Sequence, residues 1–184
     1  MQVKKKIVIS GGPGSGKSTV INLLKKRGFF CFSEVSREFI QAGKNEGRDN
    51  FFKEDPMKFS TFVWNGRLKQ YEEALSHQEK SKRDFWVFFD RGLPDVTAYL
   101  KDEGIQTQEW KKRLEDHPYD LVFLIEPVAS IYEQDHLRME KFEEALLLHQ
   151  SLKETYGQLG KYIEVPFLTP EERVEFILKH CDEK

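Results

Sequence analysis

Short apolar runs alternate along this chain with longer segments in which apolar residues recur at the three- and four-residue spacing of a helix. The runs occupy residues 6–10, 29–32, 85–89, 121–125 and 162–165. Strands that alternate with helices are typical of a parallel sheet that helices cover on both faces. The pattern therefore predicts an α/β fold of three layers, with a five-stranded parallel sheet between two layers of helices.

The ends of the predicted helices carry local signals. Gly28 follows a basic last turn of the helix over residues 17–27, which suits the position after a helix end. Asp55 and Pro56 form a cap and a first helical turn, and Thr169 and Glu172 form a capping box. Further helices are expected at residues 33–42, 56–80, 94–100, 107–114, 142–156 and from 170 onward, with a polar loop at 43–54. The inward residues of the long helix are expected to include Phe59, Phe62, Val63 and Tyr71.

The composition indicates one domain without an overall charge preference. A chain of 184 residues can bury a core without disulfides, so we expect a single domain over residues 1–184. Lysine and arginine number 29 against 31 aspartate and glutamate residues, and this balance predicts no nucleic-acid partner. No apolar stretch reaches the length of a membrane span or a signal peptide, and the two cysteines form no disulfide framework. We therefore expect a cytoplasmic protein, and the sequence leaves its oligomeric state open.

A glycine-rich motif follows the first predicted strand. Residues 11–18 read GGPGSGKS, which fits the phosphate-binding Walker A pattern GxxxxGK[ST] between a strand and a helix. Glycines let the backbone approach phosphates closely, and the helix N-terminus adds partial positive charge. Lys17 is expected to reach the β- and γ-phosphates, and the Ser18 hydroxyl to bind Mg²⁺. The motif does not fit GxGxxG, because Lys17 stands in place of the third glycine, which disfavours a dinucleotide site. The predicted nucleotide-binding residues are Gly11, Gly12, Pro13, Gly14, Ser15, Gly16, Lys17, Ser18 and Thr19.

Two carboxylates follow other predicted strands at the same edge of the sheet. Asp90 ends the third strand and is expected to hold Mg²⁺ or to act on an acceptor hydroxyl; the alternative is a helix cap or a surface acid. Glu34 follows the second strand and is expected to accept a proton from a substrate hydroxyl; the alternative is an acid that stabilises the helix dipole. The sequence leaves open which of them is the catalytic base. Arg37 and Arg91 are candidates to bind an acidic substrate group or to pair with these acids, and Arg67 is interpreted as exposed.

A charged segment after the fourth predicted strand, residues 127–141, is expected to form a lid. Arg138, near Asp135, would neutralise charge on a transferring phosphoryl group, and closure would exclude water. The alternative is a solvated helix with internal ion pairs. The histidines show no metal-binding spacing, so His77, His117, His149 and His180 are interpreted as surface residues, and His136 is left undecided.

Four segments together resemble one known family. GGPGSGKST, SEVSREFI, FFDRGLPD and IYEQDHLR, in this order, are similar to segments of the small P-loop ATPase/kinase family that includes NadR-type ribosylnicotinamide kinase domains and an animal branch of GTP- and phosphoinositide-binding proteins. The resemblance spans roughly residues 5–178. It implies phosphate and Mg²⁺ roles for Lys17 and Ser18, an acceptor site at Glu34 and Arg37, a third-strand acid at Asp90, and a lid with Asp135 and Arg138. Arg91 and Asp95, within FFDRGLPD, are assigned to substrate binding, and residues 165–167 stand where related kinases contact the base.

The leading prediction is an ATP- and Mg²⁺-dependent small-molecule kinase for a nucleoside- or riboside-like acceptor. Its predicted catalytic residues are Lys17, Glu34, Asp90 and Arg138. The alternative is a regulatory protein that binds GTP or ATP with a protein or phosphoinositide partner. The NKxD and DxxG motifs of regulatory GTPases do not occur in the chain. Their absence makes a classical regulatory GTPase a less favoured interpretation. A motor of the AAA+ type is disfavoured, because no candidate helical lid domain follows the sheet. The acceptor and the preference for ATP over GTP are not determined by the sequence.

Overall fold

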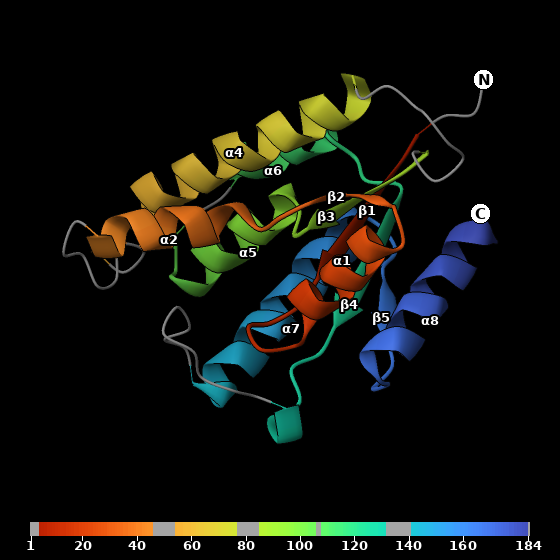
Figure 1. Ribbon diagram of the computed structural model, residues 1–184. Coiled ribbons are helices and arrows are strands. Elements are labelled where there is room, and N and C mark those ends of the chain that lie inside the picture. Colours follow the sequence, from red (N-terminus) through yellow and green to blue (C-terminus); the bar gives the residue numbers. More distant parts are fainter. Residues whose placement is uncertain (1–3, 46–53, 77–84, 106–107, 132–140, 184) are drawn as a thin grey trace.

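The five predicted strands form one parallel sheet. The computed structural model describes residues 4–45, 54–76, 85–105, 108–131 and 141–183. The strands are β1 (Lys5–Ser10), β2 (Phe30–Phe32), β3 (Trp86–Asp90), β4 (Leu121–Ile125) and β5 (Ile163–Val165). Their order in the sheet is β2-β3-β1-β4-β5 with every pairing parallel (Figure 1). The predicted α/β architecture is therefore confirmed.

Seven α-helices among the described residues connect and cover these strands. They are α1 (Lys17–Lys26), α2 (Val35–Asn45), α4 (Pro56–Ser76), α5 (Leu93–Asp102), α6 (Gln108–Glu115), α7 (Phe142–Leu159) and α8 (Pro170–Asp182), with a short 3-10 helix η2 (Ala129–Ile131). The predicted caps are confirmed: Gly28 has φ +86° after α1, and the Thr169 hydroxyl accepts a hydrogen bond from the Glu172 amide. The loop predicted at 43–54 begins later, because α2 continues to Asn45, and residues 46–53 lie outside the described part.

The alternation of side chains along each strand divides the core into two halves. Ile7 and Ile9 of β1 pack in one cluster with apolar residues of α1 and α8. Val8, between them, points to the other face and packs in a second cluster with residues of α5 and α7. Because successive side chains of a strand point to opposite faces, a continuous apolar run fills both layers. The three layers can be followed in Figure 1.

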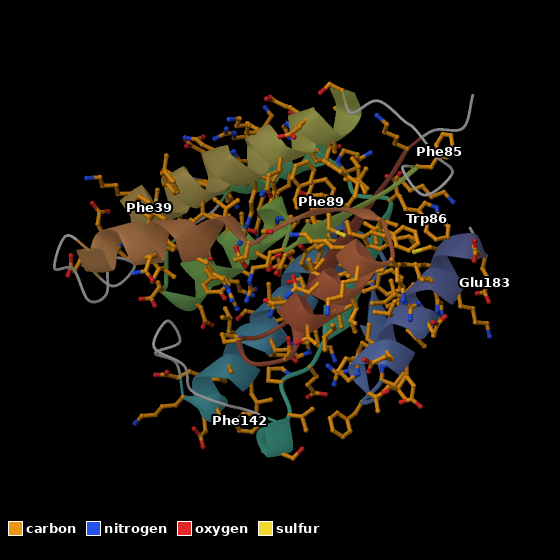
Figure 2. All side chains as sticks on the ribbon, in the orientation of Figure 1. Phe39, Phe85, Trp86, Phe89, Phe142 and Glu183 are labelled. Atoms are coloured by element: carbon orange, nitrogen blue, oxygen red, sulfur yellow. The ribbon has the colours of Figure 1, made fainter. Side chains whose placement is uncertain are left out.

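A third apolar cluster joins the helices farther from the sheet. Phe59, Val63 and Trp64 of α4 pack there with residues of α5 and α6. Phe62, predicted to face inward, is 43% exposed, and its ring stacks on Phe39 of α2 with centroids 3.8 Å apart. The prediction for Phe62 is wrong: its side chain lies outside the buried cluster of Phe59, Val63 and Trp64, and the Phe39 ring covers it only in part. In Figure 2, Phe39 lies beside α4 toward the edge of the molecule, whereas Phe89 of β3 lies near its centre. Among the described helices, none combines the length and apolarity that crossing a membrane requires.

Candidate active site

The glycine-rich loop follows the central strand β1 and is confined on two sides. A Cβ at Gly11, which has φ +147°, would lie 2.0 Å from the Ile125 carbonyl oxygen at the end of β4. A Cβ at Gly12 would lie 2.4 Å from the Ala145 carbonyl oxygen of α7. The two glycines therefore let the loop pass between β4 and α7, and the chain then enters α1 with its first amides directed at the loop. This geometry is compatible with the predicted phosphate-binding role of the loop.

Lys17 folds back over this loop. Its ammonium donates to the carbonyl oxygens of Gly11 at 2.9 Å and Gly12 at 2.8 Å, and to the Ser15 hydroxyl at 3.2 Å. Burial and then the charge of Arg91 lower the pKa of Lys17 to about 7, although the nearby acids oppose this shift. The ammonium thus stands inside the loop, where phosphate oxygens would be stronger acceptors than neutral carbonyls.

Asp90 lies at the end of β3 beside the loop, because Ile9 of β1 is its partner in the sheet register. Its Oδ2 accepts a hydrogen bond of 3.4 Å from the Ser18 hydroxyl, and its buried Oδ1 has no hydrogen-bond partner among the described residues. Burial and the neighbouring Glu34 raise the pKa of Asp90, against the opposing effect of Lys17. A hydroxyl and an incompletely bonded carboxylate are the hard oxygen ligands that Mg²⁺ takes, so the residues fit the predicted ion.

The remaining ligands of such an ion would come from elsewhere. Among the described residues there is no group of three or more histidine, cysteine or acidic side chains that could hold a metal ion. Mg²⁺ commonly needs only one or two protein ligands, because water and substrate phosphates complete its octahedron. The pair of Ser18 and Asp90 is consistent with that mode of binding.

Glu34 follows β2 and is held by two arginines from different elements. Its Oε1 accepts from Arg67 Nη2 at 2.8 Å, and its Oε2 forms an ion pair with Arg91 Nε at 2.5 Å. Burial alone would raise the pKa of Glu34, but Arg67 and then Arg91 outweigh it, so the pKa lies below its usual range. Glu34 is therefore an ionised carboxylate in a buried place.

The interpretation of Arg67 as exposed is wrong. The residue is 4% exposed, and besides Glu34 it binds the Gly92 carbonyl oxygen with a hydrogen bond of 3.0 Å. A signal for its burial was present in the sequence: Arg67 continues the stripe of Val63, Trp64 and Tyr71 at helical spacing. An arginine on a buried stripe needs an acid to pair with, and Glu34 supplies it.

Arg91 is the one non-glycine residue in the described part of the chain with positive φ, at +74°. Its guanidinium bridges Glu34 and Asp95, with Nη1 2.9 Å from Asp95 Oδ1. Arg91 therefore pairs with Glu34, one of the two acids predicted as its partners, and also with Asp95. Asp95 is fully buried. The assignment of Arg91 and Asp95 to substrate binding stays a prediction, and both already carry internal hydrogen bonds.

The other predicted residues divide into three groups. Arg37 is exposed on α2, and its charge lowers the pKa of Asp90, so it lies within electrostatic range of the site. His77, Asp135, His136 and Arg138 lie outside the described residues.

His149 was interpreted as a surface residue, which is wrong: it is 4% exposed on α7. Burial and the charges of Lys153 and Lys17 lower its pKa to about 4, so it is neutral near pH 7.

A pocket of about 310 Å³ opens at the ends of β4 and β5. Its lining includes Ile125, Glu126, Val165, Pro166, Phe167 and Arg173. Arg173 of α8, not considered in the sequence analysis, donates to the Ser15 carbonyl oxygen at 2.8 Å, and its guanidinium lies 5.7 Å from the Phe167 ring. Residues 165–167, which were predicted to contact the base, thus line this pocket. Arg173, which also lines it, is hydrogen-bonded to the glycine-rich loop.

Solved structures share this fold. NadR protein in complex with NR has a TM-score of 0.75 at 19% identity, over 98% of this chain and 51% of that chain. NadR protein in complex with NAD and AMP-PNP has a TM-score of 0.71 at 19% identity, over 98% and 49%. Deoxyadenosine kinase from M. mycoides, with products dCMP and a flexible dCDP bound, has a TM-score of 0.65 at 17% identity, over 97% and 100%.

The chain spans about half the length of the NadR chains, so the resemblance concerns one part of those proteins. At these identities the similarity establishes the fold, which is that of P-loop kinases. No curated protein sequence matches the chain. The sequence profile of one family, AAA_28, described as an AAA domain, matches residues 6–173, which is most of the chain. The protein therefore belongs to the AAA_28 family of AAA domains.

Proposed function

We propose that this protein is a Mg²⁺-dependent phosphotransferase that moves the γ-phosphoryl group of ATP to a hydroxyl of a small, nucleoside- or riboside-like acceptor. The observation that carries the proposal is Glu34, an ionised buried carboxylate held by Arg67 and Arg91 close to Lys17 and Asp90. A protein that only binds a nucleotide has no chemical need for such a group beside the phosphate loop. A kinase needs it to orient the acceptor hydroxyl and to receive its proton.

The proposed roles follow from the positions of the side chains. Lys17 and the amides at the start of α1 bind the β- and γ-phosphates, and Ser18 and Asp90 hold Mg²⁺. When bound, Mg²⁺ neutralises charge that develops on the phosphate oxygens. The acceptor oxygen forms a bond to the γ-phosphorus while the bond from that phosphorus to the bridging oxygen of ADP breaks. The hydroxyl proton passes to the Glu34 carboxylate.

Glu34 is proposed as the base in preference to Asp90. Asp90 bonds to the Ser18 hydroxyl and is directed at the place where the metal is expected. Glu34 stands farther along the same sheet edge, and neither of its arginines comes from the phosphate loop. The low pKa of Glu34 suits this reaction, because phosphoryl transfer depends more on the orientation of the hydroxyl than on a strong base. Arg37, Arg91 and Asp95 at the acceptor side and Arg138 in the lid complete the proposal.

The relatives support the class of the acceptor. One NadR structure contains NR and another contains NAD and AMP-PNP, and the deoxyadenosine kinase structure contains nucleotide products. These are properties of those proteins, and they suggest a nucleoside or riboside as the first acceptors to test. The pocket at Phe167 and Arg173 is proposed to hold the base of the phosphate donor.

The test is coupled ATP turnover with Mg²⁺ across a panel of nucleosides, ribosides, nucleotides and sugars. We expect one acceptor to stimulate turnover, and Lys17→Ala and Asp90→Asn to abolish the stimulation. Lys111→Ala, an exposed lysine on α6, is the matched control and keeps full activity. Tight binding of ATP or GTP in a thermal-shift assay, with no stimulation by any member of the panel, would support the regulatory alternative and contradict the proposal.

A further inference from the structure

Asp95 makes more hydrogen bonds than its place at the start of α5 requires. Its Oδ2 accepts from the Gly92 amide at 3.0 Å, as expected of the third residue in a helical capping box. The same carboxylate accepts from the Tyr156 hydroxyl of α7 at 2.6 Å and from the Ser10 hydroxyl of β1 at 2.5 Å. With its ion pair to Arg91, Asp95 thus connects β1, α7 and the turn after β3. Helix capping alone leaves the bonds from Tyr156, Ser10 and Arg91 unexplained.

The ion pair acts on a residue whose backbone conformation is unfavourable. Arg91 lies in the left-handed region, which side chains other than glycine rarely adopt. Its amide still donates to the Ile9 carbonyl oxygen at 3.1 Å, so the turn remains attached to β1. A conformation of this kind persists where the surroundings hold it, and here two buried carboxylates bind opposite sides of the guanidinium. Glu34 binds Nε, and Asp95 binds Nη1.

The orientation of Glu34 depends on Arg91. Arg67 and, at 3.3 Å, the Ser36 amide both donate to Oε1, and these bonds to one oxygen leave the plane of the carboxylate unset. Arg91 holds Oε2 and so sets the plane of the group. Because a reacting hydroxyl must meet a carboxylate oxygen in a defined direction, a loss of this second bond would slow transfer without removing the base.

We propose that Asp95 is a positioning residue for the transfer step: Ser10 and Tyr156 fix Asp95, Asp95 fixes Arg91, and Arg91 sets the orientation of Glu34. The inference rests on the proposed function, since it gives Glu34 the task of receiving the acceptor hydroxyl. It adds Ser10 and Tyr156 to the residues that the reaction needs, and it gives Asp95, which is fully buried, a positioning role in place of direct contact with the acceptor.

The first experiment requires no acceptor. In the nucleotide-free protein, ¹⁵N NMR measures the exchange of the Arg91 Nε proton with water for wild type, Asp95→Asn and Tyr156→Phe. We expect exchange to be faster by at least about tenfold in Asp95→Asn, because Arg91 loses the bond from Nη1 to a charged group that keeps its Nε against Glu34, and by a few fold in Tyr156→Phe. Tyr162→Phe is the matched control, because Tyr162 packs against the same apolar cluster as Tyr156 and its hydroxyl is not a donor to Asp95. Unchanged exchange in Tyr156→Phe and in a folded Asp95→Asn would overturn the inference.

The second experiment separates positioning from folding. With the acceptor found in the panel, Tyr156→Phe should lower kcat by about tenfold and change KM for ATP by less than about threefold, because the phosphate loop is intact. Tyr162→Phe should change neither. Equal falls in kcat for the two tyrosine variants would indicate a structural effect and overturn the inference. If no acceptor is found, the proposed function fails, while the exchange of the Arg91 proton still decides whether Asp95 holds Arg91.

Discussion

Arg67 of α4 and Glu34 after β2 form a salt bridge of 2.8 Å in which both side chains are buried. Removal of one partner from a buried pair leaves a charge without full compensation, which is strongly destabilising. We expect Arg67→Met to lower the free energy of unfolding by about 3 kcal/mol in urea denaturation. Lys69→Met, an exposed change on the same helix, should alter it by less than about 0.5 kcal/mol. Equal stability of the two variants would show that Arg67 does not compensate Glu34.

The same pair predicts how this effect depends on pH. Arg67 and Arg91 outweigh burial and lower the pKa of Glu34, so the carboxylate stabilises the fold above its unfolded pKa of about 4.3. This contribution is lost as the pH falls through the lower pKa of the folded state. The difference in unfolding free energy between wild type and Arg67→Met should therefore be smaller at the acid end than at pH 7. A difference that grows in acid would contradict the assigned direction.

We expect the substitution of Asp90 to affect stability and activity in different ways. Within the described part of the chain its buried Oδ1 has no hydrogen-bond partner, and burial together with Glu34 raises its pKa, so its charge is unfavourable in the nucleotide-free fold. Asp90→Asn should leave the melting temperature unchanged or raise it, with a gain of up to about 1 kcal/mol. Phosphoryl transfer should fall at least about a hundredfold, because a Mg²⁺ ligand is lost. Asp116→Asn, at an exposed position, should affect neither quantity.

Because the pKa of Lys17 is lowered, we expect the protein to take up protons when it binds a nucleotide. The pKa of about 7 makes Lys17 largely neutral at pH 8, and phosphates would favour the charged ammonium. Binding of Mg²⁺-free ADP at pH 8 should therefore take up close to one proton, from about 0.5 to 0.9. At pH 6 the uptake should be small or reversed, because Lys17 is already charged. Calorimetry in two buffers with different ionisation enthalpies measures this number, and equal uptake at both pH values would contradict the prediction.

Gly12 and Gly104 are favoured as glycine for different reasons: a close backbone contact at Gly12 and a positive φ at Gly104. A Cβ at Gly12 would lie 2.4 Å from the backbone of α7, whereas a Cβ at Gly104 would meet no atom of the described residues within 4 Å. Gly104→Ala should lose about 1–2 kcal/mol, since its φ of +72° is unfavourable for alanine. Gly12→Ala should lose more and should also weaken ATP binding, because the loop or α7 must shift. Binding by calorimetry and unfolding in urea check the pair, and a Gly12→Ala variant with wild-type ATP affinity would contradict the prediction.

Features that depend on neighbouring residues were predictable from the sequence. The strand at Leu121–Ile125, the end of α1 before Gly28 and the capping box at Thr169 were all confirmed, because their signals lie within a few residues of the element itself. The glycine-rich loop was also predictable, because its motif lies within eight consecutive residues, 11–18. Its place at the end of a strand follows from the strand–loop–helix order, whereas the central position of that strand is set by the strand order of the sheet.

The errors concern residues whose burial depends on distant packing. Arg67 and His149 were interpreted as exposed because they are polar, yet other helices and the sheet cover the faces that carry them. Phe62 was expected in the core because it is apolar, yet it packs on Phe39 at the outer side of α4. Residue type predicts burial only on average, and the neighbouring element decides the individual case.

The sequence by itself determined the α/β class, the place of the glycine-rich loop between a strand and a helix, and the set of charged residues that follow the strands. Only the tertiary structure decided how these charges pair. Arg67 reaches Glu34 across 33 positions and Tyr156 reaches Asp95 across 61, and both contacts exist because α4, α5 and α7 cover the same face of the sheet. Arg91 joins the two pairs because it stands at the end of β3, between β2 and β1. Local pattern can place an acid at the end of a strand, but its partner is set by the order of the strands and by which helices cover them.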